Sequence, residues 1–135
     1  MDEVSRKYSA NAMMGNWGGV KYINKQIEHE VIEDCFTLTH KVDNGRFRFV
    51  EDGLETEDLS CDSLSLIEDK PLSLKVCCER IAGIGRGEWQ TRVEASGTMT
   101  ATSEHFHVTS RLEVFEGDQR LFFRTWDFQV PRDQV

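Results

Sequence analysis

The sequence predicts an all-β protein, built as a single antiparallel, strongly curved sheet or partly open barrel of six to eight strands in meander order. Apolar or small residues alternate with polar ones from residue 89 to 102, a period of two that is typical of a strand with one dry face. The alternation inverts after Ser103-Glu104, as a two-residue turn requires. Consecutive hairpins that each carry one dry face can hide it by curling together, which favours a curved sheet or barrel.

The first 31 residues are predicted to contribute a cover and an edge. Residues 1–19 are rich in Gly and Asn, so we expect an irregular N-terminal cover, with Met13, Met14 and Trp17 packed on the sheet. Residues 20–31 mix apolar and charged side chains. We expect a long edge strand there, because charges protect an edge from unwanted pairing.

The next alternating run is predicted to end in a tight hairpin. Apolar and polar residues alternate from Phe36 to Val42, and Asn44-Gly45 follows. Asn-Gly is the strongest short-range signal for a type I′ turn, because both residues accept a positive φ. With these two residues as the loop, Val42 lies opposite Phe47.

The middle of the chain is predicted to be two further strands and a bend. Residues 51–58 are acidic but lack the ligand spacing of a calcium loop, so a solvated strand or loop is expected. Residues 59–67 and 72–78 are interpreted as strands separated by Glu68 to Pro71. The glycines of residues 81–87 are expected to bend the chain into the last three strands.

The last three strands have the most definite predicted register. A turn at Ser103-Glu104 pairs Ala101 with Phe106, Met99 with Val108, Gly97 with Ser110, Ala95 with Leu112 and Val93 with Val114. A three-residue loop over 117–119 then sets Val114 opposite Phe122, Ser110 opposite Trp126, Val108 opposite Phe128 and Phe106 opposite Val130.

One row of this predicted sheet is a candidate ligand-binding site. Gly97 and Ser110 lie beside Trp126 in the predicted register and leave room for its indole. Arg124 is the exception on the same face, and its guanidinium is expected to reach water at the sheet margin. The core is expected to centre on nine residues: Phe36, Leu38, Phe47, Leu74, Val93, Met99, Val108, Leu112 and Trp126.

Length and charge limit the class of protein. A chain of 135 residues suits one domain spanning 1–135. Its net charge of −8 disfavours nucleic acid and anionic membranes. The sequence has no run of 18 apolar residues and an acidic start, so we expect a cytoplasmic protein. The four cysteines are then expected to be free thiols.

The sequence offers little chemistry. It contains no G-x-S-x-G nucleophile elbow, and we predict no catalytic residue and no cofactor. His105 and His107 share one face of a strand, the way that two metal ligands are often presented. They are weak metal candidates, since polar-face histidines beside threonines need no metal.

Several motifs in the second half of the chain resemble a known family. These are Asp69-Lys70-Pro71-Leu72-Ser73, Gly85-Arg86-Gly87-Glu88-Trp89, Arg92-Val93-Glu94, Met99-Thr100-Ala101-Thr102, Phe115-Glu116-Gly117-Asp118, Trp126-Asp127 and Val130-Pro131-Arg132-Asp133. Together they resemble the C-terminal end of CocE/NonD hydrolases, the family of cocaine esterase and X-Pro dipeptidyl peptidases. The resemblance spans roughly residues 35 to 135.

That resemblance implies a non-catalytic accessory β-domain. In such hydrolases the nucleophile, acid and histidine lie in an upstream α/β-hydrolase domain, so none of them maps onto this chain. The expected partner is an α/β-hydrolase domain or a second copy of the chain. The alternative hypothesis is a small lipocalin-like protein that binds an apolar ligand inside the curved sheet, at Gly97, Ser110, Arg124 and Trp126.

Overall fold

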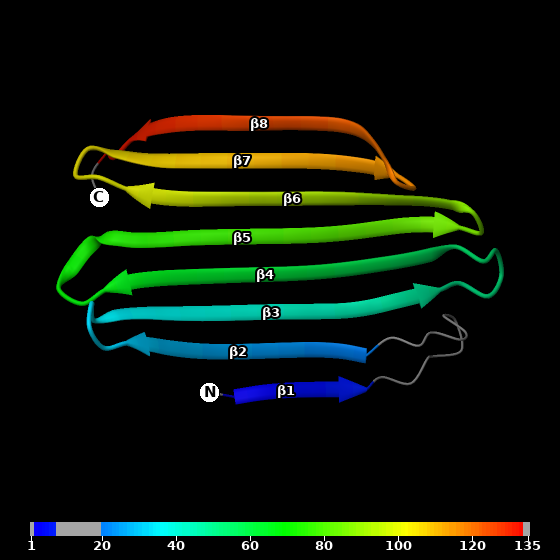
Figure 1. The fold of residues 1–135 in the computed structure, drawn as a ribbon, viewed down its shortest axis with the longest axis horizontal. Helices are drawn as coiled ribbons and strands as arrows, with labels where there is room; N and C mark the ends of the chain where they lie inside the picture. Colours follow the sequence, from blue (N-terminus) through cyan, green and yellow to red (C-terminus); the bar gives the residue numbers. More distant parts are fainter. Residues whose placement is uncertain (1, 8–19, 134–135) are drawn as a thin grey trace.

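The structure is one antiparallel β-sheet (Figure 1). The computed structural model describes residues 2–7 and 20–133. Eight strands follow each other in the order of the chain. They are β1 (Asp2–Lys7), β2 (Val20–Glu30), β3 (Cys35–Arg48), β4 (Glu55–Ile67), β5 (Lys70–Arg86), β6 (Trp89–Ala101), β7 (His105–Glu116) and β8 (Gln119–Pro131). The predicted all-β antiparallel meander is confirmed.

The sheet is not closed into a barrel. Figure 1 shows β1 and β8 at opposite edges, and contacts between the described strands join only neighbours in sequence. The expected core is therefore wrong: the described part of the chain has no buried hydrophobic side chain, and Phe36 and Leu38 are 39% and 40% exposed. A single layer leaves both faces open, whereas a core needs a second layer or a closed barrel.

The predicted register of the last three strands is confirmed. All five pairs across β6 and β7 occur as expected, from Val93 with Val114 to Ala101 with Phe106. Across β7 and β8, Ser110 lies opposite Trp126. The loop differs, because Gly117-Asp118 is a two-residue turn with Glu116 opposite Gln119. An irregularity next to Val114 then restores the expected pairing with Phe122.

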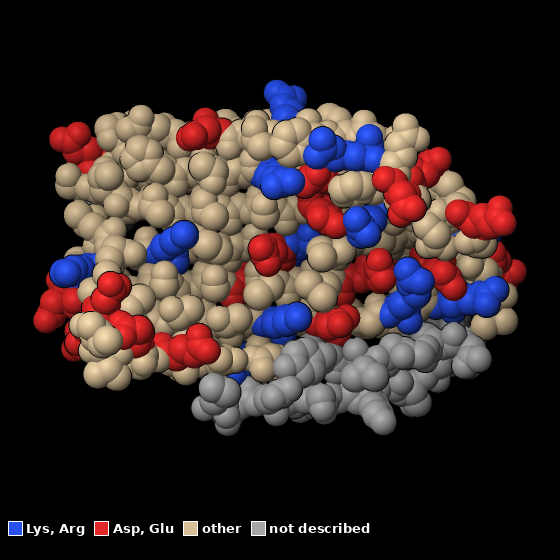
Figure 2. All heavy atoms as spheres, viewed as in Figure 1, with Lys and Arg blue, Asp and Glu red and all other residues tan. Residues whose placement is uncertain are grey.

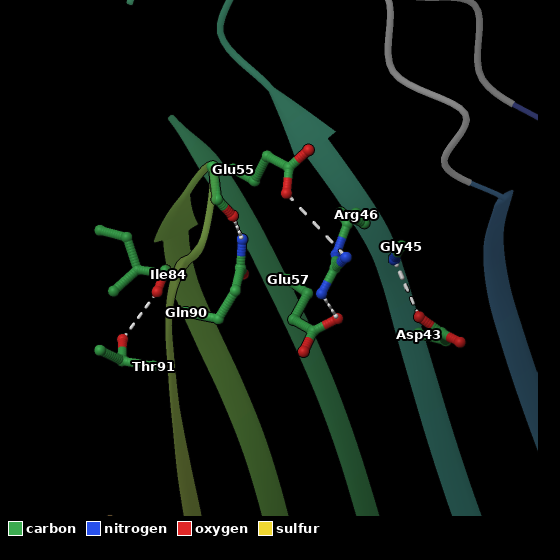
Figure 3. Close-up of polar contacts among 9 residues, drawn as sticks. Asp43, Gly45, Arg46, Glu55, Glu57, Ile84, Gln90 and Thr91 are labelled. Carbon is green, nitrogen blue, oxygen red and sulfur yellow. Dashed lines mark hydrogen bonds and ion pairs between the residues drawn. The ribbon is translucent and has the colours of Figure 1, made fainter. Parts of the chain in front are cut away.

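The predicted hairpin at Asn44-Gly45 is wrong, and the two residues form a bulge inside β3. Asp43 pairs with Leu59 and Arg46 with Glu57, so Asn44-Gly45 together face one residue of β4. Gly45 has a φ of 74°, and its amide donates 2.9 Å to the Asp43 carboxylate (Figure 3). The positive φ is used for a glycine bulge.

The chain reverses instead at residues 49–54. The amide of Phe49 donates to the Leu54 carbonyl at 2.8 Å, and the amide of Gly53 donates to the Phe49 carbonyl at 2.8 Å. Gly53 supplies a φ of 69°. Gly45 and Gly53 both adopt a positive φ, the first in a bulge and the second in a turn.

Two other elements differ from expectation. Residues 2–7 form β1, which pairs with β2, so β2 is not the edge strand. The rest of the expected cover, including Met13, Met14 and Trp17, lies outside the described residues. Residues 81–86 continue β5 as a strand, and the bend comes at Gly87-Glu88.

The register defines two faces. We call the face that carries Val93, Leu112 and Phe122 the apolar face, because cross-strand partners project to the same side and side chains alternate along each strand. The polar face carries Glu94, Glu113 and the residues aligned with them. The alternation that the sequence predicts across β6 to β8 is therefore present in the structure.

Candidate docking surface

A row of apolar side chains crosses seven strands of the apolar face. Each member is the Cα partner of the next, from β2 to β8. The row consists of Ile27, Leu38, Leu64, Val76, Met99, Val108 and Phe128. We call it the seven-residue row.

The seven-residue row is open to solvent along much of its length. Ile27 is 63% exposed, Leu64 38% and Phe128 50%. Phe36 and Leu66 are paired with each other one step toward the β2–β3 turn, and each is 39% exposed. A contiguous exposed apolar surface of this kind marks an interaction site in a soluble protein, whereas single apolar residues do not.

A charged pair borders the seven-residue row on the side away from Phe36 and Leu66, on the same face of the sheet. Arg80 of β5 donates from Nη1 and Nη2 to the two Asp62 oxygens of β4, at 2.8 and 3.0 Å. This two-pronged hydrogen bond lowers the pKa of Asp62. Cys78 of β5 is the cross-strand partner of Asp62. Burial first, and then the hydrogen bond to Asp62, raise the pKa of its thiol.

The predicted ligand-binding residues are brought together. Gly97, Ser110 and Trp126 lie in one row across β6, β7 and β8. The guanidinium carbon of Arg124 lies 5.1 Å from the centre of the Trp126 ring, a cation–π contact.

A hollow of about 350 Å³ lies at these residues. Besides Gly97, Ser110 and Trp126, it is lined by Ser96, Thr98, Thr109, Arg111, Thr125 and Asp127. These six residues carry their side chains on the polar face.

The polar face carries a cluster that the sequence did not predict. Glu113 is 7% exposed and pairs with Arg111 and with Arg120, the latter at 3.0 Å. Arg120, followed by Arg111, lowers the pKa of the Glu113 carboxyl. Both guanidinium groups also lie over the Phe123 ring, at 5.3 Å for Arg111 and 4.9 Å for Arg120.

This arrangement recurs along the polar face. Arg92 pairs with Glu94 at 2.8 Å and lies over Phe115 at 4.7 Å. Figure 2 shows basic and acidic side chains intermingled over the half of the sheet where the β5–β6 and β7–β8 turns lie. Opposite charges that neutralise one another in this way suit a solvated surface better than an anion or cation site.

Acidic residues of the stretch 51–58 form ion pairs with arginine side chains of the same chain. Arg46 beside the β3 bulge pairs with Glu57 at 3.4 Å and with Glu55 at 4.0 Å (Figure 3). Asp52 in the β3–β4 turn pairs with Arg86 at 2.9 Å. The acidic residues therefore hold neighbouring arginines, in line with a solvated strand and turn.

The two candidate metal ligands lie on the polar face of β7. His107 is opposite Thr100 and Gln129, and His105 is opposite Pro131. His40 lies on the other, apolar face, on β3 opposite Asp62. Within residues 2–7 and 20–133, no group of three or more His, Cys, Asp and Glu could hold a metal ion. The four cysteines are free, with Cys77 and Cys78 on opposite faces.

Fold and surface together define a single-layer antiparallel β-protein with one apolar face suited to docking. No protein-family model matches the chain, and comparisons with curated proteins and with solved structures found no match either. The part of the chain that the structure describes contains no helix long and apolar enough to span a membrane.

Proposed function

We propose that the chain is a non-catalytic accessory β-domain that packs, through the apolar face, on the α/β domain of a serine hydrolase. The observation that carries this proposal is the exposed seven-residue row in a sheet whose described residues bury no hydrophobic side chain. A second layer on that face would supply the missing core. The resemblance to the C-terminal end of CocE/NonD hydrolases supplies the kind of partner.

Packing of this kind gives the partner support rather than a reactive group. Burial of apolar surface contributes about 25 cal/mol per Å². Leu38 and Met99 are two of the side chains that would lose water contact. The functional contribution is then stability of the hydrolase, or part of the wall of its substrate pocket. The chain itself is expected to turn over neither aryl esters nor X-Pro amides.

The test uses two lysine substitutions at neighbouring residues that point to opposite faces. Met99 lies in the seven-residue row and Thr98 on the polar face. Binding to a separately expressed α/β-hydrolase domain of a CocE/NonD hydrolase is measured by titration calorimetry. Met99→Lys should abolish binding and Thr98→Lys should preserve it, because a buried unpaired ammonium is costly.

Two results would contradict the proposal. One is equal binding by both variants. The other is ester turnover by the isolated chain that a serine-directed inhibitor stops.

The second candidate function is binding of an apolar ligand. The hollow of about 350 Å³ that Gly97, Ser110 and Trp126 help to line favours it. Its other lining residues, however, are Ser, Thr, Arg and Asp with side chains on the polar face, which suit an apolar molecule poorly. Fatty-acid titration followed by tryptophan fluorescence tests this alternative. A saturable shift that Trp126→Phe removes would support it, whereas an unchanged spectrum would count against it.

A further inference from the structure

The outer edge of β8 presents unused backbone hydrogen-bonding groups. The amide of Thr102 donates to the His105 carbonyl, and the amide of Arg132 donates to the Glu104 carbonyl, both at 2.8 Å. In an antiparallel pair, the backbone groups of successive residues point alternately to either side. Odd-numbered residues of β7 therefore bond to β6, and even-numbered residues of β7 and β8 bond to each other.

It follows that four residues of β8 direct both their amide and their carbonyl away from the sheet: Phe123, Thr125, Asp127 and Gln129. No described strand pairs with that side of β8. Pro131 also faces outward, but proline has no backbone N–H that could be left without a partner at this edge. From 122 to 130 the pairing of β8 with β7 is regular. Natural proteins usually blunt such an edge by shortening it, covering it or charging it.

We propose that β8 pairs antiparallel with β8 of a second copy of the chain, about a two-fold axis at Trp126. In this register Thr125 lies opposite the partner's Asp127, and Phe123 lies opposite the partner's Gln129. All four outward residues of each copy are then used, because each pair exchanges two hydrogen bonds. If the register shifts by one pair in one direction, Phe123 lies opposite the partner's Pro131, which has no amide. If it shifts in the other direction, Gln129 lies opposite the partner's Leu121, next to the irregularity of β8.

Side chains complement each other in the same register. Phe122 meets the partner's Val130 on the apolar face, and Arg124 meets the partner's Phe128, where a cation–π contact can form. The Thr125 hydroxyl can donate to the partner's Asp127 carboxylate. Within the regular segment 122–130, no like charges lie directly opposite. The pairing leaves the apolar face uncovered, so it is independent of docking on a hydrolase.

The first experiment compares two substitutions at Thr125 in the full chain by light scattering coupled to gel filtration. The wild type should have twice the mass of the 15.6 kDa chain. Thr125→Pro removes an amide that the sheet itself does not use, so it should weaken the dimer at least about tenfold. Thr125→Ala keeps the amide and should remain dimeric.

Disulfide trapping tests the register independently. Trp126 would face its own copy as a non-hydrogen-bonded pair with Cα atoms about 4.5 Å apart, within the range that a disulfide spans. Trp126→Cys should cross-link under mild oxidation, with the linked peptide identified by mass spectrometry. Thr125→Cys, opposite Asp127, should not. A monomeric wild type at about 0.1 mM, a folded Thr125→Pro dimer, or the reverse cross-linking pattern would overturn the proposal.

Discussion

Arg120 of β8 donates a hydrogen bond of 3.0 Å from Nη1 to Oε2 of Glu113 on β7. Glu113 also pairs with Arg111 of its own strand, so the carboxylate of a residue that is 7% exposed joins two arginines. The two guanidinium groups lie over Phe123. This cluster ties the last two strands together on the polar face, where the described residues offer no hydrophobic core to do so.

Glu113→Gln should lower the free energy of unfolding and make it depend less on pH in the acidic range. The pKa of Glu113 is lowered in the folded chain by Arg120 and then Arg111. The stabilisation is therefore complete above the unfolded-state pKa and is lost as the pH falls through the lower, folded-state pKa. Urea denaturation from neutral to acidic pH checks this, and the two proteins should converge at low pH.

A matched control for that cluster is Glu94→Gln. Glu94 pairs with Arg92 at 2.8 Å, but both side chains are more than a third exposed. An exposed pair of this kind contributes about 0–1 kcal/mol. A loss at Glu94 as large as that at Glu113 would mean that burial of Glu113 adds nothing.

Asp62→Asn should make Cys78 more reactive. Burial first, and then the Asp62 carboxylate, raise the pKa of the Cys78 thiol, so removing the Asp62 charge should lower that pKa. More thiolate then forms at a given pH, and the thiolate is the form that reacts. Iodoacetamide labelling against pH, followed by peptide mass spectrometry, measures the change. Asp58→Asn, on the same strand and face, should leave the Cys78 rate unaltered.

Gly117→Ala should cost about 1 kcal/mol of unfolding free energy. Gly117 has a φ of 55°, and a Cβ there would meet no atom within 4 Å. The cost is therefore conformational rather than steric. Thermal or urea denaturation measures it, and Asp118→Ala in the same turn is the control. An unchanged midpoint for Gly117→Ala would show that the turn adapts without strain.

How far the sequence predicts this fold depends on which interaction decides each element. Between Val93 and Val130 the alternation and two short turns set the register, and the cross-strand pairs were predicted correctly. The loop at Gly117 was not, because a two-residue turn followed by an irregularity reaches the same pairing of Val114 with Phe122. The alternation of side chains does not distinguish a three-residue loop from a two-residue turn followed by an irregularity.

The docking surface was only partly predictable. The apolar residues of the seven-residue row are visible in the sequence, but their alignment across seven strands depends on where β3 bulges and reverses. Glu113 and Arg120 lie on different strands, so their pairing also needed the register. The spacing of Arg111 and Glu113, two apart on one strand, was the only local signal for that cluster.

Deleting Gly45 should be tolerated better than replacing it. Asn44-Gly45 together face one residue between the pairs Asp43–Leu59 and Arg46–Glu57. Removing one residue restores one-to-one pairing and keeps both flanking pairs and faces. Gly45→Ala instead keeps the bulge and places a Cβ at a φ of 74°, at a cost of about 1 kcal/mol or more.

Urea denaturation ranks the two variants, and deletion of Arg46 is the matched control. That deletion also shortens β3 by one residue but removes the side chain that pairs with Glu55 and Glu57 (Figure 3). It should be less stable than the Gly45 deletion. If the Gly45 deletion unfolds the protein while Gly45→Ala does not, the bulge itself is required to match β3 to β4, and its role goes beyond accommodating one extra residue.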